Sequence, residues 1–272
     1  MRTFIFATAF LLIGLAAGSI PVSDATAHWA DVRGHSIYYE VRGSGHPLLL
    51  LHGGGASISA SFSRQIDAFA ATYKIIAPEQ VGQGHSPDIS GPLSYTEMME
   101  DTAALLEQLH VTDVDVVGWS DGGILALMLA VKYPHLVHSV VISGVNIAPD
   151  GLLDSDRSDQ RNTAATSIDS EKIEVADNAP INEKATIDEK LRQLWASAPT
   201  ITELNVALLQ HLQKPVLVLT GDHDVIKLDH TMEIYRALPQ AQLSVLPNTG
   251  HATFEQRPEL VNPMVLNFLA QN

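Results

Sequence analysis

The stretch Asp113–Lys132 reads DVDVVGWSDGGILALMLAVK, and it decides the fold. Its opening DVDVV alternates Asp with Val and ends on two valines, β-branched residues that suit a buried strand. After the turn at Gly118–Gly122, apolar residues recur at helical spacing from Ile124 to Val131. The stretch therefore predicts a strand, a tight turn and a helix, with Ser120 at the apex of the turn.

The turn carries the pattern Gly-x-Ser-x-Gly. Glycine suits positions 118 and 122 because a side chain there would clash with the neighbouring strand or helix, and because the turn strains the backbone. The Ser120 hydroxyl is then expected above the sheet, at the N-terminus of a helix whose dipole favours developing negative charge. Gly-rich turns match this pattern by chance, but the strand before it and the helix after it favour a nucleophilic serine.

Composition limits the classes to which the protein can belong. The chain has 272 residues and 46% hydrophobic content, enough for one large α/β core. Its net charge of −15 argues against a nucleic-acid partner and against docking on anionic lipid. The sequence contains no cysteine, which excludes disulfides, thiolate catalysis and Cys-based zinc sites, and fits folding in an oxidising compartment.

The first 27 residues have the pattern of a secretory signal peptide. Arg2 supplies the positive charge, Phe4–Ala17 is a short apolar run, and ATA at 25–27 resembles a cleavage signal. An uncleaved anchor helix is the alternative, although the run is shorter than the roughly 20 residues that a span needs. Without a cysteine the chain cannot be a lipoprotein. We expect a secreted or periplasmic protein, cut near Ala27, that begins near His28 and has no stable membrane anchor.

Strand and helix patterns alternate along most of the rest of the chain. Together they predict a mostly parallel central sheet with helices on both faces, an α/β fold with ligand chemistry at the carboxyl ends of the strands. The segments Asp31–Glu40 and Val41–Gly45 are expected to form a short antiparallel start, namely a strand, a turn at Gly34, a second strand and then a Gly-rich turn. The other expected strands are Pro47–Leu51, Lys74–Pro78, Ser139–Ser143, Lys214–Thr220 and Gln242–Pro247, and the expected helices are Ser63–Tyr73, Tyr95–Leu109 and Val261–Leu269.

From about His35 to the C-terminus the chain resembles the α/β-hydrolase fold superfamily. Four motifs carry the resemblance, in the family's order: LLLLHGGG at 48–55, GWSDGG at 118–123, TGDHD at 220–224 and NTGH at 248–251. The resemblance implies an α/β-hydrolase fold and a serine hydrolase, most simply a carboxylesterase, that needs no metal or organic cofactor.

The resemblance also implies three catalytic residues: Ser120 as nucleophile, Asp224 as acid and His251 as general base. His251 follows the last predicted strand, and Gly250 allows the loop to reach back toward the serine. The family pattern of a glycine, two residues and an aspartate indicates Asp224. Asp222, which follows the same strand directly, is the alternative acid.

The segment His52–Gly55 follows a buried strand and resembles an oxyanion-hole loop. The expected donors are the backbone amide of Gly54, with Gly55 as the alternative, and the amide of Asp121. In this family the histidine before the glycines holds the loop by hydrogen bonds, so His52 is given a structural role.

Residues 147–213 interrupt the alternation with polar, acidic and helical sequence. By resemblance we predict a helical cap inserted between two parts of the core, residues 28–146 and 214–272. A disordered loop is the alternative, favoured by the Asp/Ser/Asn/Thr-rich stretch at 154–170. Trp119 and Trp195 are candidates for the substrate pocket, and packing against the core is the other possibility for Trp195.

No metal site is predicted, because His223 with Asp222 or Asp229 lacks a zinc-ligand spacing. The expected partner is a small-molecule ester-type substrate. A serine nucleophile weighs against haloalkane dehalogenases and epoxide hydrolases, which use aspartate there. Three alternatives stay open: a lactonase, a carbon–carbon bond hydrolase, and a receptor-like binding protein with little turnover. The sequence determines neither the acyl and alcohol specificity nor the oligomeric state.

Overall fold

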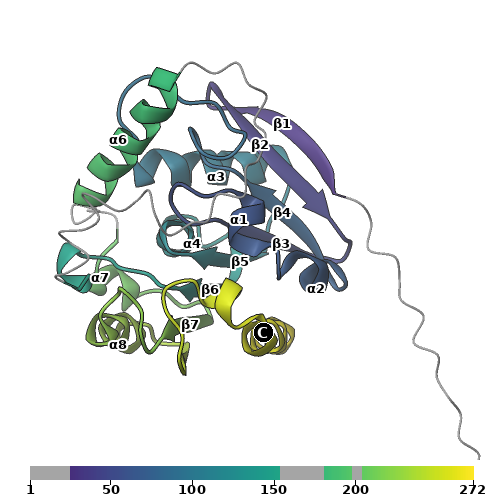
Figure 1. Cartoon of the computed structure of the whole chain (residues 1–272). Helices are drawn as coiled ribbons and strands as arrows, with labels where there is room; N and C mark the ends of the chain where they lie inside the picture. Colours follow the sequence, from purple (N-terminus) through teal and green to yellow (C-terminus); the bar gives the residue numbers. More distant parts are fainter. Residues whose placement is uncertain (1–24, 154–180, 198–203) are drawn as a thin grey trace, which may run out of the picture.

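The computed structural model describes residues 25–153, 181–197 and 204–272, which are drawn in colour in Figure 1. In this part of the chain, eight strands form one sheet in the order β1-β2-β4-β3-β5-β6-β7-β8. β2 is antiparallel to both of its neighbours, and the other pairs are parallel, as predicted. The strands are β1 (Thr26–Val32), β2 (His35–Arg42), β3 (His46–Leu51), β4 (Tyr73–Pro78), β5 (Val114–Trp119), β6 (Val137–Ser143), β7 (Val216–Gly221) and β8 (Ala241–Leu246).

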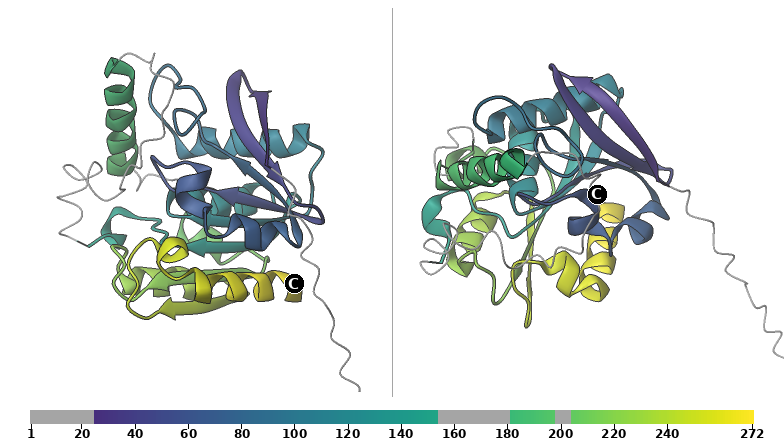
Figure 2. Two further views of the ribbon diagram at one scale, coloured as in Figure 1. Left: turned by 45° about the vertical axis from the view of Figure 1, so that its right-hand side comes forward. Right: turned by 45° about the horizontal axis from the view of Figure 1, so that its top comes forward.

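Helices cover both faces of the sheet (Figures 1 and 2). On one face α1, α2, α9 and α10 share an apolar cluster with the strands. On the other face α3, α4 and α8 do so. The described helices are α1 (Ile58–Phe62), α2 (Ile66–Ala70), α3 (Tyr95–Gln108), α4 (Asp121–Lys132), the 3-10 turn η1 (Pro149–Gly151), α6 (Ile181–Ser197), α7 (Val206–Leu209), α8 (Leu228–Ala237), α9 (Thr253–Gln256) and α10 (Pro258–Gln271).

The central strand β3 is apolar because it is buried on both faces. Its residues Leu48–Leu51 have no exposed surface. Leu49 and Leu51 belong to the cluster under α3 and α4, whereas Leu48 and Leu50 belong to the opposite cluster. Successive side chains of a strand point to opposite faces, so a strand covered on both sides needs apolar residues at every position.

The first two strands form a hairpin that is longer than predicted. Its turn is made by Arg33 (φ 53°) and Gly34 (φ 87°), the two positive φ values of a type I′ turn. β1 begins at Thr26 instead of Asp31. As an edge strand, β1 has one paired neighbour and leaves Trp29 56% exposed, so its sequence lacks the apolar pattern of a core strand.

The predicted leader lies mostly outside the described residues, which begin at 25. Thr26 and Ala27 pair with Val41 and Glu40 of β2, so a cut after Ala27 would shorten β1 by two residues. No helix within the described ranges is long and apolar enough to cross a membrane. The leader and its cleavage stay predictions.

The helix predicted over Ser63–Tyr73 is wrong in its bounds, because the chain forms two short helices, α1 and α2, separated at residues 63–65. The predicted apolar face is nevertheless present, since Phe62, Ile66 and Phe69 all pack into one cluster under the sheet. Both short helices bury their apolar residues in that cluster despite the break.

Between β6 and β7 the structure describes η1, α6 and α7, and residues 154–180 and 198–203 lie outside the described residues. α6 stands apart from the helices that cover the sheet (Figure 2). It buries Leu191 and Leu194, which are 3% and 4% exposed. The limits of the predicted cap at 147 and 213 stay predictions.

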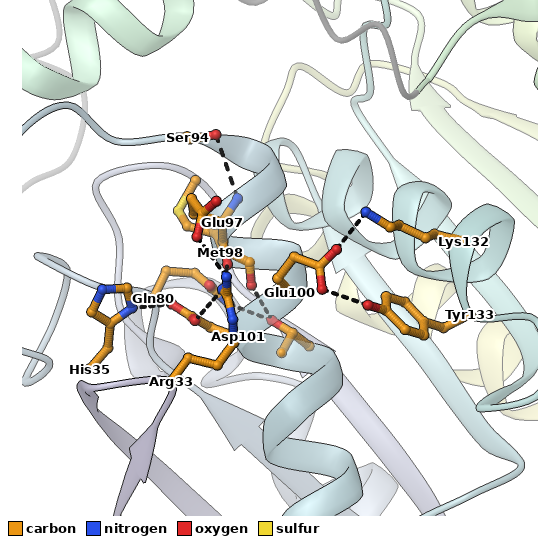
Figure 3. A network of polar contacts seen from close by, with 11 residues as sticks. Arg33, His35, Gln80, Ser94, Glu97, Met98, Glu100, Asp101, Lys132 and Tyr133 are labelled. Atoms are coloured by element: carbon orange, nitrogen blue, oxygen red, sulfur yellow. Dashed lines mark hydrogen bonds and ion pairs between the residues drawn. The ribbon is translucent and has the colours of Figure 1, made fainter.

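Polar contacts hold α3 from two sides (Figure 3). From the hairpin turn, Arg33 donates to Asp101 and to Glu97, at 2.8 Å each, and His35 Nδ1 lies 2.7 Å from Asp101 Oδ2. On the other side of the helix, Glu100 contacts the C-terminal end of α4. Asp101 is only 2% exposed, so its charge is balanced by these neighbours instead of by water.

We predict that Arg33→Ala lowers the free energy of unfolding by about 2 kcal/mol, because it removes a charged hydrogen bond from a buried carboxylate. Urea denaturation measures the change. The matched control is Arg64→Ala, whose ion pair with Glu255 has both side chains about half exposed. The control should change stability by less than about 0.5 kcal/mol. Equal losses in the two variants would contradict the role given to Arg33.

Candidate active site

Ser120 lies at the turn between β5 and α4. Its backbone has φ 54° and ψ −121°, a conformation that is unfavourable for a residue with a side chain. The Ser120 amide donates to the carbonyl of Ser143 at the end of β6 (2.8 Å), and its own carbonyl accepts from the amides of Gly123 and Ile124. These bonds hold the strained turn in place.

The glycines around Ser120 are required by close backbone packing, as the sequence predicts. A Cβ atom at Gly118 would overlap the carbonyl of Gly122. One at Gly122 would overlap the carbonyl of Leu51 at the end of β3, and one at Gly123 would overlap Val145. The turn therefore fits between two strands only because these positions have no side chain.

His251 lies between Ser120 and Asp224. Its Nε2 is 3.0 Å from Ser120 Oγ, and its Nδ1 is 2.8 Å from Asp224 Oδ1. Because a carboxylate can only accept a hydrogen bond, Nδ1 carries the proton and Nε2 is left to accept from the serine. The Trp119 indole donates to the His251 carbonyl at 2.9 Å and fixes the loop that carries the imidazole.

The Asp224 carboxylate is oriented by its own loop. Its side chain has no exposed surface, whereas the His251 side chain is 26% exposed. Oδ1 also accepts from the amide of Ile226 at 3.0 Å, and Oδ2 accepts from the Thr220 hydroxyl at 3.3 Å. The aspartate is thus fixed before any substrate binds.

Asp222, the alternative acid, does not contact His251. Its Oδ1 accepts from the amide of Thr249 at 3.0 Å, and its side chain is 38% exposed. The hydrogen bond from Thr249 lowers the pKa of the Asp222 carboxyl. The structure therefore brings Asp224, and not Asp222, to the imidazole.

The glycine loop after β3 lies beside this group. The amide of Gly55 donates to Gln83 Oε1 at 2.7 Å, so it is already occupied. Within the described residues, the amides of Gly54 and Asp121 donate to no protein acceptor. Of the two glycines that the sequence leaves open, Gly54 is therefore the one with a free donor.

The side chain of Asp121 is a feature that sequence reasoning missed. It is 8% exposed, Oδ1 accepts from the Tyr95 hydroxyl at 2.8 Å, and Oδ2 accepts from the Trp195 indole at 2.9 Å. Burial raises the pKa of the Asp121 carboxyl, and the bonds from Trp195 and Tyr95 oppose that shift. The available signal was an acidic residue at the first position of an apolar helix, but neither of its partners is near it in sequence.

Each of the two predicted pocket residues lies against a different glycine of the loop. A Cβ atom at Gly53 would lie 2.8 Å from the Trp119 ring, and one at Gly54 would lie 3.0 Å from the Trp195 ring. Trp119 also packs against the apolar cluster below the sheet. Trp195, from α6, is the one that lies on the Asp121 side of the loop.

This arrangement can perform acyl transfer. A hydroxyl hydrogen-bonded to an oriented imidazole can lose its proton as it attacks a carbonyl. Two free backbone amides beside it can bind the negative oxygen that forms.

Comparison with known proteins agrees with the geometry. The chain is 29% identical over 269 residues to the candidate carbamate hydrolase RutD of Azorhizobium caulinodans, covering 90% of this chain and 98% of the relative. It is 27% identical over 261 residues to the human serine hydrolase BPHL, covering 91% and 87%. The crystal structure of the carboxylesterase CesB (YbfK) from Bacillus subtilis superposes with a TM-score of 0.72 at 18% identity, covering 92% of this chain and 93% of that one.

The last likeness shows the fold alone, because its sequence identity is low. The family model is decisive, since it matches residues 48–264, well over half of the chain. That match spans the glycine loop, Ser120, Asp224 and His251. The chain belongs to the alpha/beta hydrolase family.

Proposed function

We propose that the protein is a serine hydrolase that cleaves a small carboxylic ester, or a related acyl bond, through an acyl-enzyme. The observation that carries the proposal is the continuous line of hydrogen bonds from Ser120 through His251 to the buried Asp224. The unoccupied amides of Gly54 and Asp121 beside that line are the second support. Neither step of the proposed reaction uses a metal or an organic cofactor.

In the first step the Ser120 oxygen attacks the ester carbonyl while His251 Nε2 takes its proton. The Gly54 and Asp121 amides bind the oxyanion, and the imidazolium, stabilised by Asp224, gives its proton to the leaving alcohol. In the second step a water loses a proton to His251 and attacks the acyl-enzyme. The bond between the acyl carbon and Ser120 Oγ then breaks, the imidazolium returns its proton to Oγ, and the acid leaves. The same residues can open a lactone or cleave an activated carbon–carbon bond, so these substrates belong in the first screen.

We propose that residues 147–213 act as the cap of this site. Two contacts of α6 support the idea: Trp195 donates to Asp121, and Lys190 Nζ lies 2.8 Å from Asp88 Oδ1 in the loop that follows β4. A Cβ atom at Gly55 would lie 3.3 Å from Leu191. A cap in this position would select the acyl and alcohol groups of the substrate.

We predict that Ser120→Ala lowers kcat on p-nitrophenyl esters by about 10⁴-fold or more, because no other group supplies the nucleophile. The parent and the variant are assayed from acetyl to palmitoyl esters by release of nitrophenol. Equal rates in both proteins would show that Ser120 is not the nucleophile. A parent that binds ligands but releases no product from esters, lactones or carbon–carbon substrates would favour the receptor-like alternative.

We predict that Asp224→Asn lowers kcat by about 10⁴-fold, because an amide in place of the carboxylate favours the wrong imidazole tautomer. The matched control is Asp222→Asn, two residues away on the same loop. It keeps an oxygen for the Thr249 amide and should stay within about three-fold of the parent. Steady-state kinetics of the two variants decide the acid, and the reverse order of effects would assign Asp222.

We propose that the protein is exported and that its signal peptide is cut near Ala27. The support is the leader's own pattern of one positive charge, an apolar run and a small-residue site. We predict that N-terminal sequencing of the expressed full chain finds His28 first, in the secreted or periplasmic fraction. A membrane-bound product that keeps Met1 would instead favour the anchor-helix alternative.

A further inference from the structure

The proposed oxyanion donor at Gly54 sits in a run of three glycines. Glycine has more backbone freedom than any other residue, so a Gly-Gly-Gly loop does not hold an amide in one direction by itself. Stabilising an oxyanion requires donors that are already oriented when the charge forms. Contacts from outside the loop must therefore fix the peptide groups on both sides of Gly54.

The peptide before Gly54 is fixed by His52. The carbonyl of Gly53 accepts from His52 Nδ1 at 2.8 Å and from the amide of Ala56 at 3.1 Å. The amide of Gln80 donates to His52 Nε2 at 3.0 Å, which leaves the proton on Nδ1. Burial lowers the pKa of His52 and keeps the ring neutral. Because a trans peptide is planar, a fixed Gly53 carbonyl also fixes the direction of the Gly54 N–H.

The peptide after Gly54 is fixed by Gln83. The Gly55 amide donates to Gln83 Oε1 at 2.7 Å. Gln83 is 5% exposed, and its Nε2 lies 3.7 Å from the sulfur of Met98 on α3. A glutamine suits the position because its side chain is long enough to reach the Gly55 amide and its amide oxygen can accept the hydrogen bond.

The segment that carries Gln83, residues 79–87, is itself held firmly. Its first residue, Glu79, is 1% exposed, accepts from the amide of Ile58 at 3.1 Å and pairs with His85 at 2.9 Å. Gln80 reaches toward α3, where its Nε2 donates to the Thr102 hydroxyl at 3.4 Å (Figure 3).

α6 lies over the two loops where they meet. A Cβ atom at Gly82 would overlap Ile187, and one at Gly55 would lie 3.3 Å from Leu191. These apolar side chains lie beside the bond between Gly55 and Gln83, which is part-buried because Gln83 is 5% exposed whereas Gly55 is exposed. Loss of the Gln83 acceptor would leave the Gly55 amide without its protein partner and the peptide after Gly54 free to turn.

We propose that Gln83 is a positioning residue for the reaction: by accepting from the Gly55 amide it fixes the peptide after Gly54, so that the loop cannot turn about Gly54 and the N–H directed by the Gly53 carbonyl stays in place for the oxyanion. This inference rests on the proposed serine-hydrolase function. Gln83 acts through Gly54 and does not itself touch the reacting atoms.

The test is Gln83→Met, which keeps the length of the side chain and removes its strong acceptor. We expect kcat on the best p-nitrophenyl ester to fall about 10- to 100-fold with KM within about three-fold of the parent, because only the charged transition state needs the oriented amide. The matched control is Gln65→Met. Gln65 is also a buried glutamine, 1% exposed, but it donates to the carbonyl of Phe254 and to Asn262. It should keep the parent kcat even if its melting temperature falls.

A second readout needs no knowledge of the natural substrate. A fluorophosphonate reacts with an activated serine: the Oγ–P bond forms, the P–F bond breaks, fluoride leaves, and the proton passes to the histidine. The P=O oxygen takes the place of the oxyanion. The labelling rate of Gln83→Met should therefore fall by about the same factor as its kcat. If that variant does not fold, Gln83→Asn, one methylene too short to reach Gly55, takes its place with the same expected result.

The outcomes separate the two proposals. A parent that hydrolyses esters and is labelled, with a Gln83 variant that matches it in both assays, overturns the role of Gln83 and leaves the serine-hydrolase proposal standing. A variant that raises KM while keeping kcat also overturns it, because Gln83 would then act in substrate binding. A parent that is neither active nor labelled overturns both proposals.

Discussion

The backbone of Ser120 lies at φ 54°, and most of the structure around it serves to hold that conformation. Such a conformation costs on the order of 1–3 kcal/mol for a residue with a side chain, so it persists only where the surroundings leave no alternative. Here β5 and the nine residues Gly122–Ala130 of α4 are buried, and the Ser120 amide is bonded to the end of β6. The packing of the sheet and of α4 therefore determines the direction of the Ser120 hydroxyl.

The same sheet determines where the other two groups of the proposed triad lie. Ser120 follows β5, Asp224 follows β7 and His251 follows β8, all parallel strands. Parallel strands place their carboxyl ends at one edge, so three loops far apart in sequence converge there. Because Asp224 is buried, its carboxylate stays fixed. Because His251 is partly exposed, its imidazole stays accessible to a substrate.

The glycine loop after β3, by contrast, is not held in place by its own residues. Its glycines let other groups come close to the backbone, and side chains on other elements hold the loop in one conformation. His52 and Gln83 hold the two peptides beside Gly54, and the Asp121 side chain joins α3 to α6 through Tyr95 and Trp195. α3 contacts Asp121 through Tyr95 at its start and Gln83 through Met98 one turn later. The hairpin turn is bonded to Asp101 in the next turn of α3. A helix that takes no direct part in the proposed chemistry therefore positions much of the site.

Much of the fold was readable from the sequence, because the core strands and α4 are apolar in the patterns that burial on two faces demands. The nucleophile turn was readable too, since its glycines, its serine and its flanking elements are contiguous. The local pattern failed at β1, an edge strand that leaves Trp29 exposed and so lacks the apolar pattern of a core strand. It also failed at α1 and α2, whose apolar residues share one buried cluster although the helices are separate.

The sequence by itself determined the α/β class, the order of the motifs and the candidate residues Ser120 and His251, because these depend on local geometry and chain order. It left both Asp222 and Asp224 as candidates for the acid, since two aspartates on one loop differ only in the groups that they contact. Tertiary structure alone decided that Asp224 meets the imidazole while Asp222 meets the Thr249 amide. It also decided that Gln83 reaches Gly55 across 28 residues, a contact with no local signal because packing, not spacing, brings the two together.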